Sequence, residues 1–437
     1  MPLKSRRAIL PITLACALLM PARLFAQRTL IHAGTLIDGV ASSPRTNVTI
    51  VVEDGKITAL EPGFSPPRNE DAVYDFKKRF VLPGLMDMHT HLSGQTEKAG
   101  YLKRFQLYPA DNALIATQYL KNTLLAGFTT VRDLGGSEGV DLALREAVKR
   151  GDVAGPRMFV AGKSLAVMGG HADPTNSYRE DILGVPGVEE GVVNGVESAR
   201  RATLLAIKRG ADVVKITATA GVLSLSGNAQ NPQFTEEEIR VIVQTAADFG
   251  KKVAAHAHGA EGAKRAIRAG VVSIEHGTYL DEEAFELMKK HGTYWVPTLT
   301  AGRSVADSAK IPGYYHDLVV PKALEIGPRI QGTFARGYKA GVAIAFGTDA
   351  GVFRHGHNAK EFEYMVEAGM SPMAAIKAAT YHAAKLLGVL DKLGTLEAGK
   401  IADVIAVDAD PLQNIKTLQN VSFVMKAGVV YKHDLGK

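Results

Sequence analysis

Short apolar runs rich in β-branched residues alternate with longer stretches of helical periodicity from about residue 80 to residue 388. This alternation is typical of βα units that build a parallel sheet. The predicted strands are Phe80–His91, Thr129–Leu134, Arg157–Lys163, Asp212–Thr219, Lys252–His258, Val272–Gly277, Tyr294–Thr300 and Val342–Asp349. The predicted helices include Ala110–Ala126, Ser198–Lys208, Glu236–Phe249 and Pro321–Lys339. Eight parallel units predict an α/β protein with a closed (β/α)8 TIM barrel, and a doubly wound open sheet is the alternative.

The two ends of the chain have a different texture. Gln27–Lys78 and the tail from Gly394 contain short alternating runs broken by Gly, Asp and Pro, which favours antiparallel strands. Since sequence-distant ends often meet in space, we predict that they pair into one small β-sandwich domain. The predicted domains are therefore the β-sandwich, from residues 27–82 and 389–437, and the barrel, from residues 83–388.

The first 26 residues are typical of a secretory signal peptide. Lys4, Arg6 and Arg7 precede an apolar stretch from Ala8 to Met20, and the small residue Ala26 ends the segment. An uncleaved membrane anchor is the alternative, but the apolar stretch is short for a span. The pattern predicts an exported protein, periplasmic or secreted, that has no membrane association after cleavage.

Composition narrows the partners and the metal chemistry. The net charge is +6, and without the signal segment the chain loses four cations and no acid and falls to +2. No Lys/Arg-rich run follows, so we predict no nucleic-acid partner. The only cysteine, Cys16, lies in the signal segment. Any metal in the mature chain is therefore held by nitrogen and oxygen ligands, which suits zinc.

Six residues with metal-binding or basic side chains lie at or near the ends of predicted strands. They are His89, His91, Lys215, His256, His276 and Asp349. A strand's period of two points both imidazoles of the His-x-His pair to one face, and imidazole is the commonest side-chain metal ligand. In a barrel the carboxyl ends of the strands meet at one face. The pattern predicts a metal site there.

Lys215 is the most discriminating of the six. The pleat directs it to the same side as Val213 and Thr217, towards the interior. A buried ammonium without a partner is costly, so the residue requires a chemical explanation. Pairing with Asp349, or escape to solvent, is the alternative to a role at the metal site.

Further residues are candidates for contact with a substrate. His258 shares the inward face with His256, so it either contacts the substrate and polarises its carbonyl, or packs. His171, in the loop after the third strand, is a substrate contact or a turn-stabilising residue. Val222 and Leu223 give the loop after the fourth strand an apolar lip.

The neighbours of two acids also suggest roles. Glu275 adjoins His276 and points to the other side of its strand, so we expect it to support the site structurally. Asp349 lies between Gly347 and Gly351, whose lack of side chains is expected to leave room for metal and water.

The chain resembles the amidohydrolase superfamily. The motifs that carry this likeness are VLPGLMDMHTHL, AGFTTVRDLGG, DVVKITATAGVLS, KVAAHAHG, VVSIEHGTYL, AIAFGTDAGV and the closing LGTLEAGKIADVIAVDADPL. Within the superfamily it is similar to the imidazolonepropionase-like and Xaa-Pro or Xaa-Arg dipeptidase branch, and most of all to bacterial amidohydrolases that cleave ochratoxin A.

This resemblance implies a cofactor and a mechanism. It implies two divalent metal ions, zinc first, held by the six residues, with Lys215 carboxylated by carbon dioxide so that its carbamate bridges the metals. In the resembling enzymes the aspartate corresponding to Asp349 binds one metal and shuttles protons, and a metal-bridging hydroxide attacks the carbonyl.

The resemblance also implies a substrate class and an assembly. It implies hydrolysis of the amide bond of N-acyl amino acids or small peptides, as in conversion of ochratoxin A to ochratoxin alpha and phenylalanine, by a homo-oligomer. Hydrolysis of cyclic amides, lactones or organophosphates is the first alternative. A non-catalytic assembly protein is the alternative from another class.

Overall fold

The computed structural model describes residues 28–434 apart from 99, 137 and 226. The predicted signal peptide and Cys16 lie outside the described residues. Within them, no helix is both long and apolar enough to cross a membrane.

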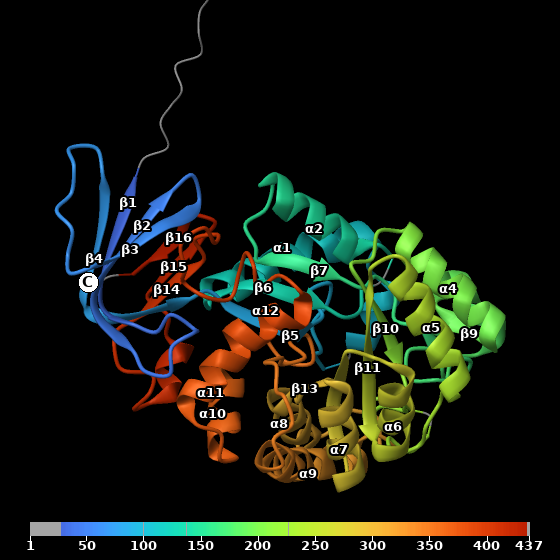
Figure 1. Cartoon of the computed structure of the whole chain (residues 1–437). Coiled ribbons are helices and arrows are strands. Elements are labelled where there is room, and N and C mark those ends of the chain that lie inside the picture. Colours follow the sequence, from blue (N-terminus) through green and yellow to red (C-terminus); the bar gives the residue numbers. More distant parts are fainter. Residues whose placement is uncertain (1–27, 99, 137, 226, 435–437) are drawn as a thin grey trace, which may run out of the picture.

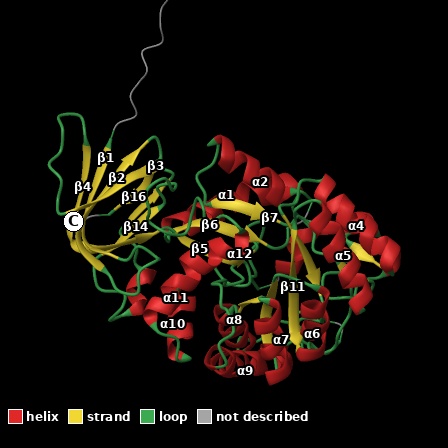
Figure 2. Ribbon diagram, in the orientation of Figure 1, coloured by secondary structure: helices red, strands yellow, loops and turns green. Residues whose placement is uncertain are grey.

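The described chain combines parallel and antiparallel sheets with helices around them (Figures 1 and 2). The strands are β1 Thr29–Leu36, β2 Arg45–Glu53, β3 Lys56–Pro62, β4 Ala72–Pro83, β5 Leu85–Thr90, β6 Phe128–Asp133, β7 Arg157–Val160, β8 Ala166–Val167, β9 Val192–Val193, β10 Val213–Thr217, β11 Lys252–Gly259, β12 Ser273–Tyr279, β13 Tyr294–Val296, β14 Val404–Val407, β15 Phe423–Lys426 and β16 Val429–His433. The α-helices are α1 Pro109–Leu125, α2 Val140–Arg150, α3 Glu180–Leu183, α4 Val196–Lys208, α5 Glu236–Asp248, α6 Ala260–Ala269, α7 Glu282–His291, α8 Leu299–Ala309, α9 Val320–Lys339, α10 Lys360–Glu367, α11 Pro372–Lys377 and α12 Ala383–Leu387.

The middle of the chain forms two parallel sheets, with strand orders β5-β6-β7 and β10-β11-β12-β13. Single parallel bridges continue this pairing beyond the named strands. Leu165 pairs with Ile216, Trp295 with Ile344, and Thr90 with Ala350. The predicted alternation of strands and helices is therefore present as an α/β fold, with helices outside the strands (Figure 2).

Three predicted strands differ from the structure. The run Phe80–His91 is divided at Gly84 between β4 and β5, where a Cβ would lie 2.2 Å from Thr129 Oγ1. Only glycine permits so close an approach to Thr129. At this point the chain passes from the sheet that contains β4 to the sheet that contains β5. The run Tyr294–Thr300 ends as a strand at Val296, and α8 begins at Leu299. Val342–Asp349 forms one isolated bridge, at Ile344, instead of a regular strand, and a second bridge follows at Ala350.

Both ends of the chain contribute to one seven-stranded sheet of order β16-β15-β14-β4-β1-β2-β3. Figure 1 shows the red C-terminal strands beside the blue N-terminal ones. These strands form one hydrogen-bonded sheet, and their arrangement as a β-sandwich stays a prediction. Its buried residues, including Ile50, Phe76 and Phe423, form a core of their own. The proposed domain boundaries stay a prediction.

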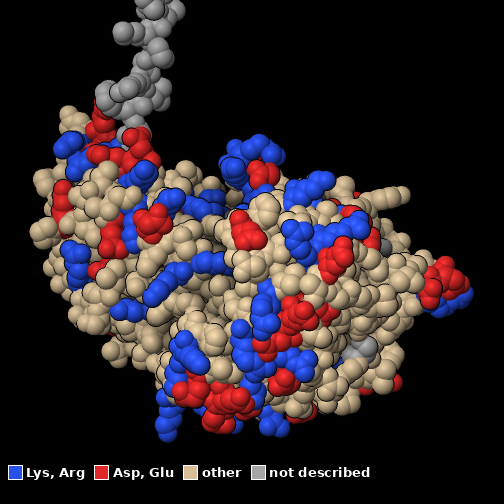
Figure 3. Space-filling model, turned by 45° about the vertical axis from the view of Figure 1, so that its right-hand side comes forward, with Lys and Arg blue, Asp and Glu red and all other residues tan. Residues whose placement is uncertain are grey.

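The largest apolar core lies between the parallel strands and their helices, and it includes Phe128, Trp295 and Phe346. Over the face shown in Figure 3, acidic and basic side chains are interspersed. The described chain thus buries one large core beneath the strand ends that carry the candidate ligands.

Candidate metal centre

The imidazoles of the His-x-His pair are held by hydrogen bonds at their Nδ1 atoms. His89 Nδ1 lies 2.9 Å from Glu275 Oε2, and His91 Nδ1 lies 2.9 Å from the Gly135 carbonyl oxygen. The Nε2 atoms lie on the side of Asp349, whose Oδ1 is 3.6 Å from His89 Nε2 and 3.2 Å from His91 Nε2. A bond to one ring nitrogen leaves the other free as a ligand.

Glu275 connects His89 to a buried arginine that sequence reasoning missed. Its Oε1 accepts a hydrogen bond of 2.8 Å from Arg132, which also donates to the Met88 carbonyl and contacts Ser273. The Arg132 side chain is 2% exposed. Burial would raise the pKa of Glu275, but the Arg132 charge and the His89 contact hold it low, at about 2. An ionised carboxylate therefore orients His89. An arginine inside the apolar run TTVRD was the available signal.

Lys215 lies inside the cavity, on β10, and is 3% exposed. Its Nζ is 3.4 Å from His89 Nε2. Among the described residues it forms no ion pair, so the alternative of direct pairing with Asp349 is not observed. Burial lowers the pKa of Lys215 to about 8. More of this amine is therefore neutral at neutral pH than in a solvent-exposed lysine.

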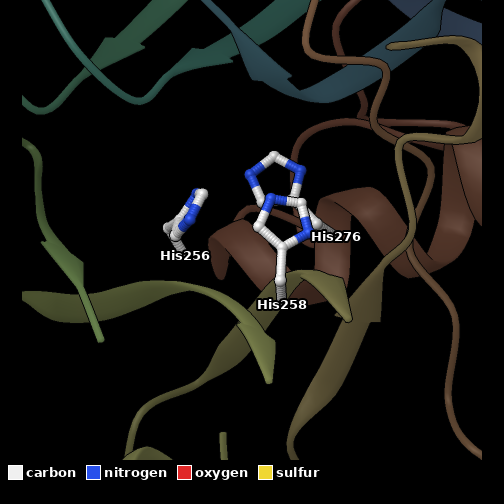
Figure 4. Close-up of side chains that lie close together, drawn as sticks. All are labelled: His256, His258 and His276. Carbon is white, nitrogen blue, oxygen red and sulfur yellow. The ribbon is translucent and has the colours of Figure 1, made fainter. Parts of the chain in front are cut away.

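Three further imidazoles converge from β11 and β12. The rings of His256, His258 and His276 lie together in Figure 4, with centroids 4.6–4.9 Å apart. His258 Nδ1 is 2.8 Å from Thr278 Oγ1, and His276 Nδ1 is 2.8 Å from Thr298 Oγ1. Two groups can each hold a metal ion, namely His89 with His91 and Asp349, and His256 with His258 and His276. His258 thus stands among the candidate ligands as well as at the cavity.

Asp349 completes the first group, and the glycines beside it serve another purpose than the one expected. A Cβ on Gly347 would lie 3.0 Å from the His89 nitrogen and 2.3 Å from Val296 Cγ1, and one on Gly351 would lie 2.8 Å from His91 Cβ. These glycines make room for the segments that contain Val296, His89 and His91, whereas the sequence suggested room for metal and water. The Asp349 amide donates to the His89 carbonyl at 2.7 Å.

The backbone is left-handed at three residues of the site. The φ angles are 70° at His276, 54° at Thr298 and 61° at Asp349. Such angles cost free energy in residues other than glycine, and they are concentrated at functional sites. Here they turn the side chains of strand ends towards one point.

The protonation of these groups suits metal binding. Burial lowers the pKa of His89 to about 4 and that of His258 to about 3, and it lowers the pKa of His256 and His276 as well. The pKa of His91 is raised instead, because the hydrogen bond and charge of Asp349 outweigh the effect of burial. Although burial alone would raise it, the charges of His89, His91 and Lys215 lower the pKa of Asp349. Neutral imidazole and ionised carboxylate are the forms that bind metals.

The metal assignment can be tested on whether the donor atoms are already occupied by hydrogen bonds. Asp349 Oδ1 is buried and has no well-formed hydrogen bond among the described residues. A buried carboxylate oxygen that lacks a well-formed hydrogen bond is rare in folded proteins. Together with the imidazoles, it forms a nitrogen and oxygen donor set that fits zinc or a related divalent ion.

The candidate ligands form the floor of a cavity of about 220 Å³. His171, Val222 and Leu223 line it, as the sequence suggested for substrate contacts. His171 stacks on His256 with centroids 4.3 Å apart, and its Nδ1 contacts Ser224 Oγ. Gly221 makes space for this ring, because a Cβ there would lie 2.2 Å from His171 Cε1.

Much of the cavity wall comes from helices that sequence reasoning did not connect with the site. The wall residues of α8 and α9 are Ala301, Gly302, Val305, Ile326 and Ile330. The i, i+4 spacing of the two isoleucines could have indicated a shared helix face, but it could not indicate that this face meets the metal centre.

Glu361 of α10 supports this wall from behind. Its carboxylate accepts hydrogen bonds from the Leu299 amide at 2.8 Å and from the Thr300 amide and hydroxyl, both at 2.7 Å. These groups belong to the first turn of α8, where unpaired amides favour an acidic partner. Glu361 thereby fixes the helix start next to Thr298.

Residues 80–431 match the Amidohydrolase family, and the chain belongs to that family. An ochratoxinase from Aspergillus niger is 34% identical over 429 residues, which cover 93% of this chain and 87% of the relative. A crystal structure described as a Xaa-Pro dipeptidase with bound methionine in the active site is 49% identical, with a TM-score of 0.90 over 93% of this chain and all of that one. An imidazolonepropionase from Rhizobium rhizogenes is 24% identical, covering 82% of this chain and 86% of the relative.

Together these comparisons make the protein an enzyme, a hydrolase that acts on amide bonds. They confirm the predicted superfamily branch and decide against a non-catalytic assembly protein. The family is metal-dependent, in agreement with the two groups of candidate ligands.

Proposed function

We propose that the protein is a binuclear metal-dependent hydrolase of N-acyl amino acids or small peptides whose released amino acid has an apolar side chain and a free carboxylate. The observation that carries this proposal is the convergence of two ligand groups and Lys215 on the floor of one cavity with an apolar wall. The free amino acid in the Xaa-Pro dipeptidase structure, methionine, combines the same two chemical features.

The scaffold that we infer is a closed eight-stranded barrel. Support comes from backbone hydrogen bonds on both sides of residues 342–350, which join the two parallel sheets. The Ala345 amide donates to the Trp295 carbonyl at 2.9 Å, and the Met88 amide donates to the Phe346 carbonyl at 2.9 Å. On the opposite side the Leu165 amide donates to the Lys215 carbonyl at 2.7 Å. A closed barrel gathers all the strand ends at one face.

Lys215 is proposed to carry a carbamate. Its neutral amine adds to carbon dioxide, forms a nitrogen–carbon bond and releases one proton. The change replaces a buried cation by an anionic oxygen donor and so removes the cost of the buried ammonium. The burial of Lys215 favours the neutral amine that this step needs.

The bound divalent ions would be held by His89, His91 and Asp349 and by the His256 and His276 group together with the Lys215 carbamate. When bound, such ions make a water acidic enough to attack near neutral pH and polarise a carbonyl. Zinc is the proposed metal because the ligands offer nitrogen and oxygen.

The protein's own residues then handle protons and position. Asp349 Oδ1, ionised and without a firm hydrogen-bond partner, accepts the proton of the attacking water and delivers it to the departing nitrogen. His258 Nδ1 is engaged by Thr278, which leaves Nε2 to face the substrate carbonyl. The apolar wall excludes water from the side chain of the substrate.

The test combines metal analysis with a substrate panel. Purified protein should contain divalent metal at two ions per chain, and it should hydrolyse N-acyl-phenylalanine, Xaa-Phe dipeptides and ochratoxin A. Hydantoins, lactones and organophosphates are the comparison substrates. Faster turnover of any of these three classes than of the N-acyl amino acids would refute the proposed substrate class.

A further inference from the structure

We infer that Lys322 is the anchor for the free carboxylate of the substrate, with the apolar wall beside it receiving the side chain of the same amino acid. This inference rests on the proposed function and names the residue that selects its substrate. The sequence offered His171 and His258 for the polar contacts at the cavity.

Lys322 belongs to the i, i+4 row of α9 that supplies two residues of the cavity wall, and it does not itself line the cavity. Residues four apart on a helix lie on one face, and Lys322 precedes Ile326 and Ile330 at that spacing. Both isoleucines line the cavity and are buried. Lys322 therefore continues their row towards the start of α9, about one helical turn from Ile326. The row presents two apolar side chains followed by one cation.

The ammonium of Lys322 has no acidic partner among the described residues. Its one described hydrogen bond is donated to the Ser224 carbonyl, in the loop that also provides Val222 and Leu223. Ser224 Oγ in turn contacts Nδ1 of His171. The cation thus lies against the loop that closes the cavity beside His171, and a neutral carbonyl leaves most of its charge uncompensated.

The position of the Lys322 ammonium does not favour the stability of the folded protein. Lys322 stands in the first turn of a 20-residue helix, where the helix dipole disfavours positive charge. It is half-buried, and burial lowers its pKa. Residues whose charge is unfavourable for the local structure, as here at a helix start, are concentrated at functional sites. A bound carboxylate would supply the missing counter-charge.

Two contacts connect Lys322 with the cavity, because the Ser224 carbonyl accepts its hydrogen bond and Ser224 Oγ contacts His171, which lines the cavity. Apart from Lys215 on the floor, no lysine or arginine lines the cavity within the described residues. Lys322 is therefore the cation available to a carboxylate that enters along α9.

Binding of non-reacting ligands tests the anchor without turnover. Calorimetry on the metal-loaded protein should show L-phenylalanine binding at least about tenfold more tightly than L-phenylalaninol. A hydrogen bond to a charged group is expected to raise the affinity by about that factor or more. Lys322→Gln keeps a donor for the Ser224 carbonyl but removes the charge, and it should reduce the preference to near unity. Lys322→Arg should retain most of it.

A matched control is Lys339→Met, which removes a lysine from the last turn of the same helix and should keep the wild-type preference. Thermal unfolding of each variant checks folding. The anchor is overturned if wild-type protein does not prefer phenylalanine. It is equally overturned if Lys322→Gln keeps the preference, or weakens both ligands alike as a purely structural tie to Ser224 would.

Turnover separates this inference from the proposed function. The kcat/KM for N-acetyl-phenylalanine and for its carboxamide should differ by about tenfold or more in wild-type protein, and by little in Lys322→Gln. Preferential, Lys322-dependent binding of phenylalanine without hydrolysis of any N-acyl amino acid would refute the proposed function and keep the anchor. Hydrolysis with an unchanged acid preference in Lys322→Gln would refute the anchor alone.

Discussion

The floor and the wall of the cavity are built by different means. The floor consists of polar residues at strand ends, such as His89, Lys215 and His276, each tied by a hydrogen bond or held by a strained backbone. The wall consists of apolar residues of α8 and α9, held by packing and, at the start of α8, by hydrogen bonds to Glu361. The alternation along a strand fixes the direction in which each side chain points, whereas helices that are held mainly by packing can shift relative to each other. We expect the floor to determine the reaction and the wall to determine the substrate.

Lys215→Ala should have the largest effect, because it removes a donor from the centre of the floor. Activity should be lost almost entirely, and metal content should fall below two ions per chain. Short-chain carboxylic acids should restore part of the rate by filling the vacated space. Lys208→Ala, at an exposed position on α4, is the control. Wild-type rate with full metal content in Lys215→Ala would remove the carbamate from the mechanism.

Asp349→Asn should have the next largest effect. The change keeps shape but removes the proton acceptor, so kcat should fall by about 10²–10⁴-fold with a much smaller change in KM. Steady-state kinetics with N-acetyl-phenylalanine measures both. A raised KM with an intact kcat would make Asp349 a binding residue and would move the proton transfer elsewhere.

Gly302→Ala should affect the wall and leave the floor intact. A Cβ at Gly302 would lie 2.8 Å from Ile330 Cγ2, so the Ile330 side chain or its helix must shift. We expect destabilisation of about 1–3 kcal/mol from overpacking. The rate on phenylalanine substrates should fall more than the rate on alanine substrates, at unchanged metal content.

The matched control is Gly332→Ala on α9, where a Cβ meets nothing within 4 Å. It should be neutral or stabilising, because alanine favours a helix. Equal losses on phenylalanine and alanine substrates in Gly302→Ala would contradict the assignment of selectivity to the wall.

Glu361→Gln should change the rate least of the four, since Glu361 lies behind the wall. Burial raises the pKa of Glu361 from 4.5 to about 8. Folding then favours the protonated acid, so the free energy of unfolding should fall as pH rises from 4.5 to 8, and level off above 8. Glutamine does not titrate, so the variant should lack this decline.

Chemical unfolding at pH 5 and pH 8 measures the difference between wild-type and variant. Glu363→Gln, on the same helix, is the control; the Lys416 hydrogen bond lowers the pKa of Glu363. If the wild-type protein instead gains stability relative to Glu361→Gln as pH rises, the three donors on α8 hold Glu361 ionised.

The sequence predicted the elements with strong periodicity, and it failed where tertiary contacts override local pattern. The residues from Tyr294 read as one strand to Thr300, but Thr298 takes a left-handed turn and α8 begins at Leu299. The buried carboxylate of Glu361, 61 residues away in sequence, fixes that helix start. No local pattern contains a contact at that separation.

The amino-acid sequence by itself determined the α/β alternation, the family and the positions of the candidate ligands. Those signals are local, since a strand's period of two fixes which side chains share a face. Only the tertiary structure decided that Arg132 and Glu275 orient His89, that glycines at 347 and 351 admit the neighbouring strand, and that α8 and α9 form the wall. The physical reason is that these features depend on close packing between elements far apart in the chain, which periodicity does not encode.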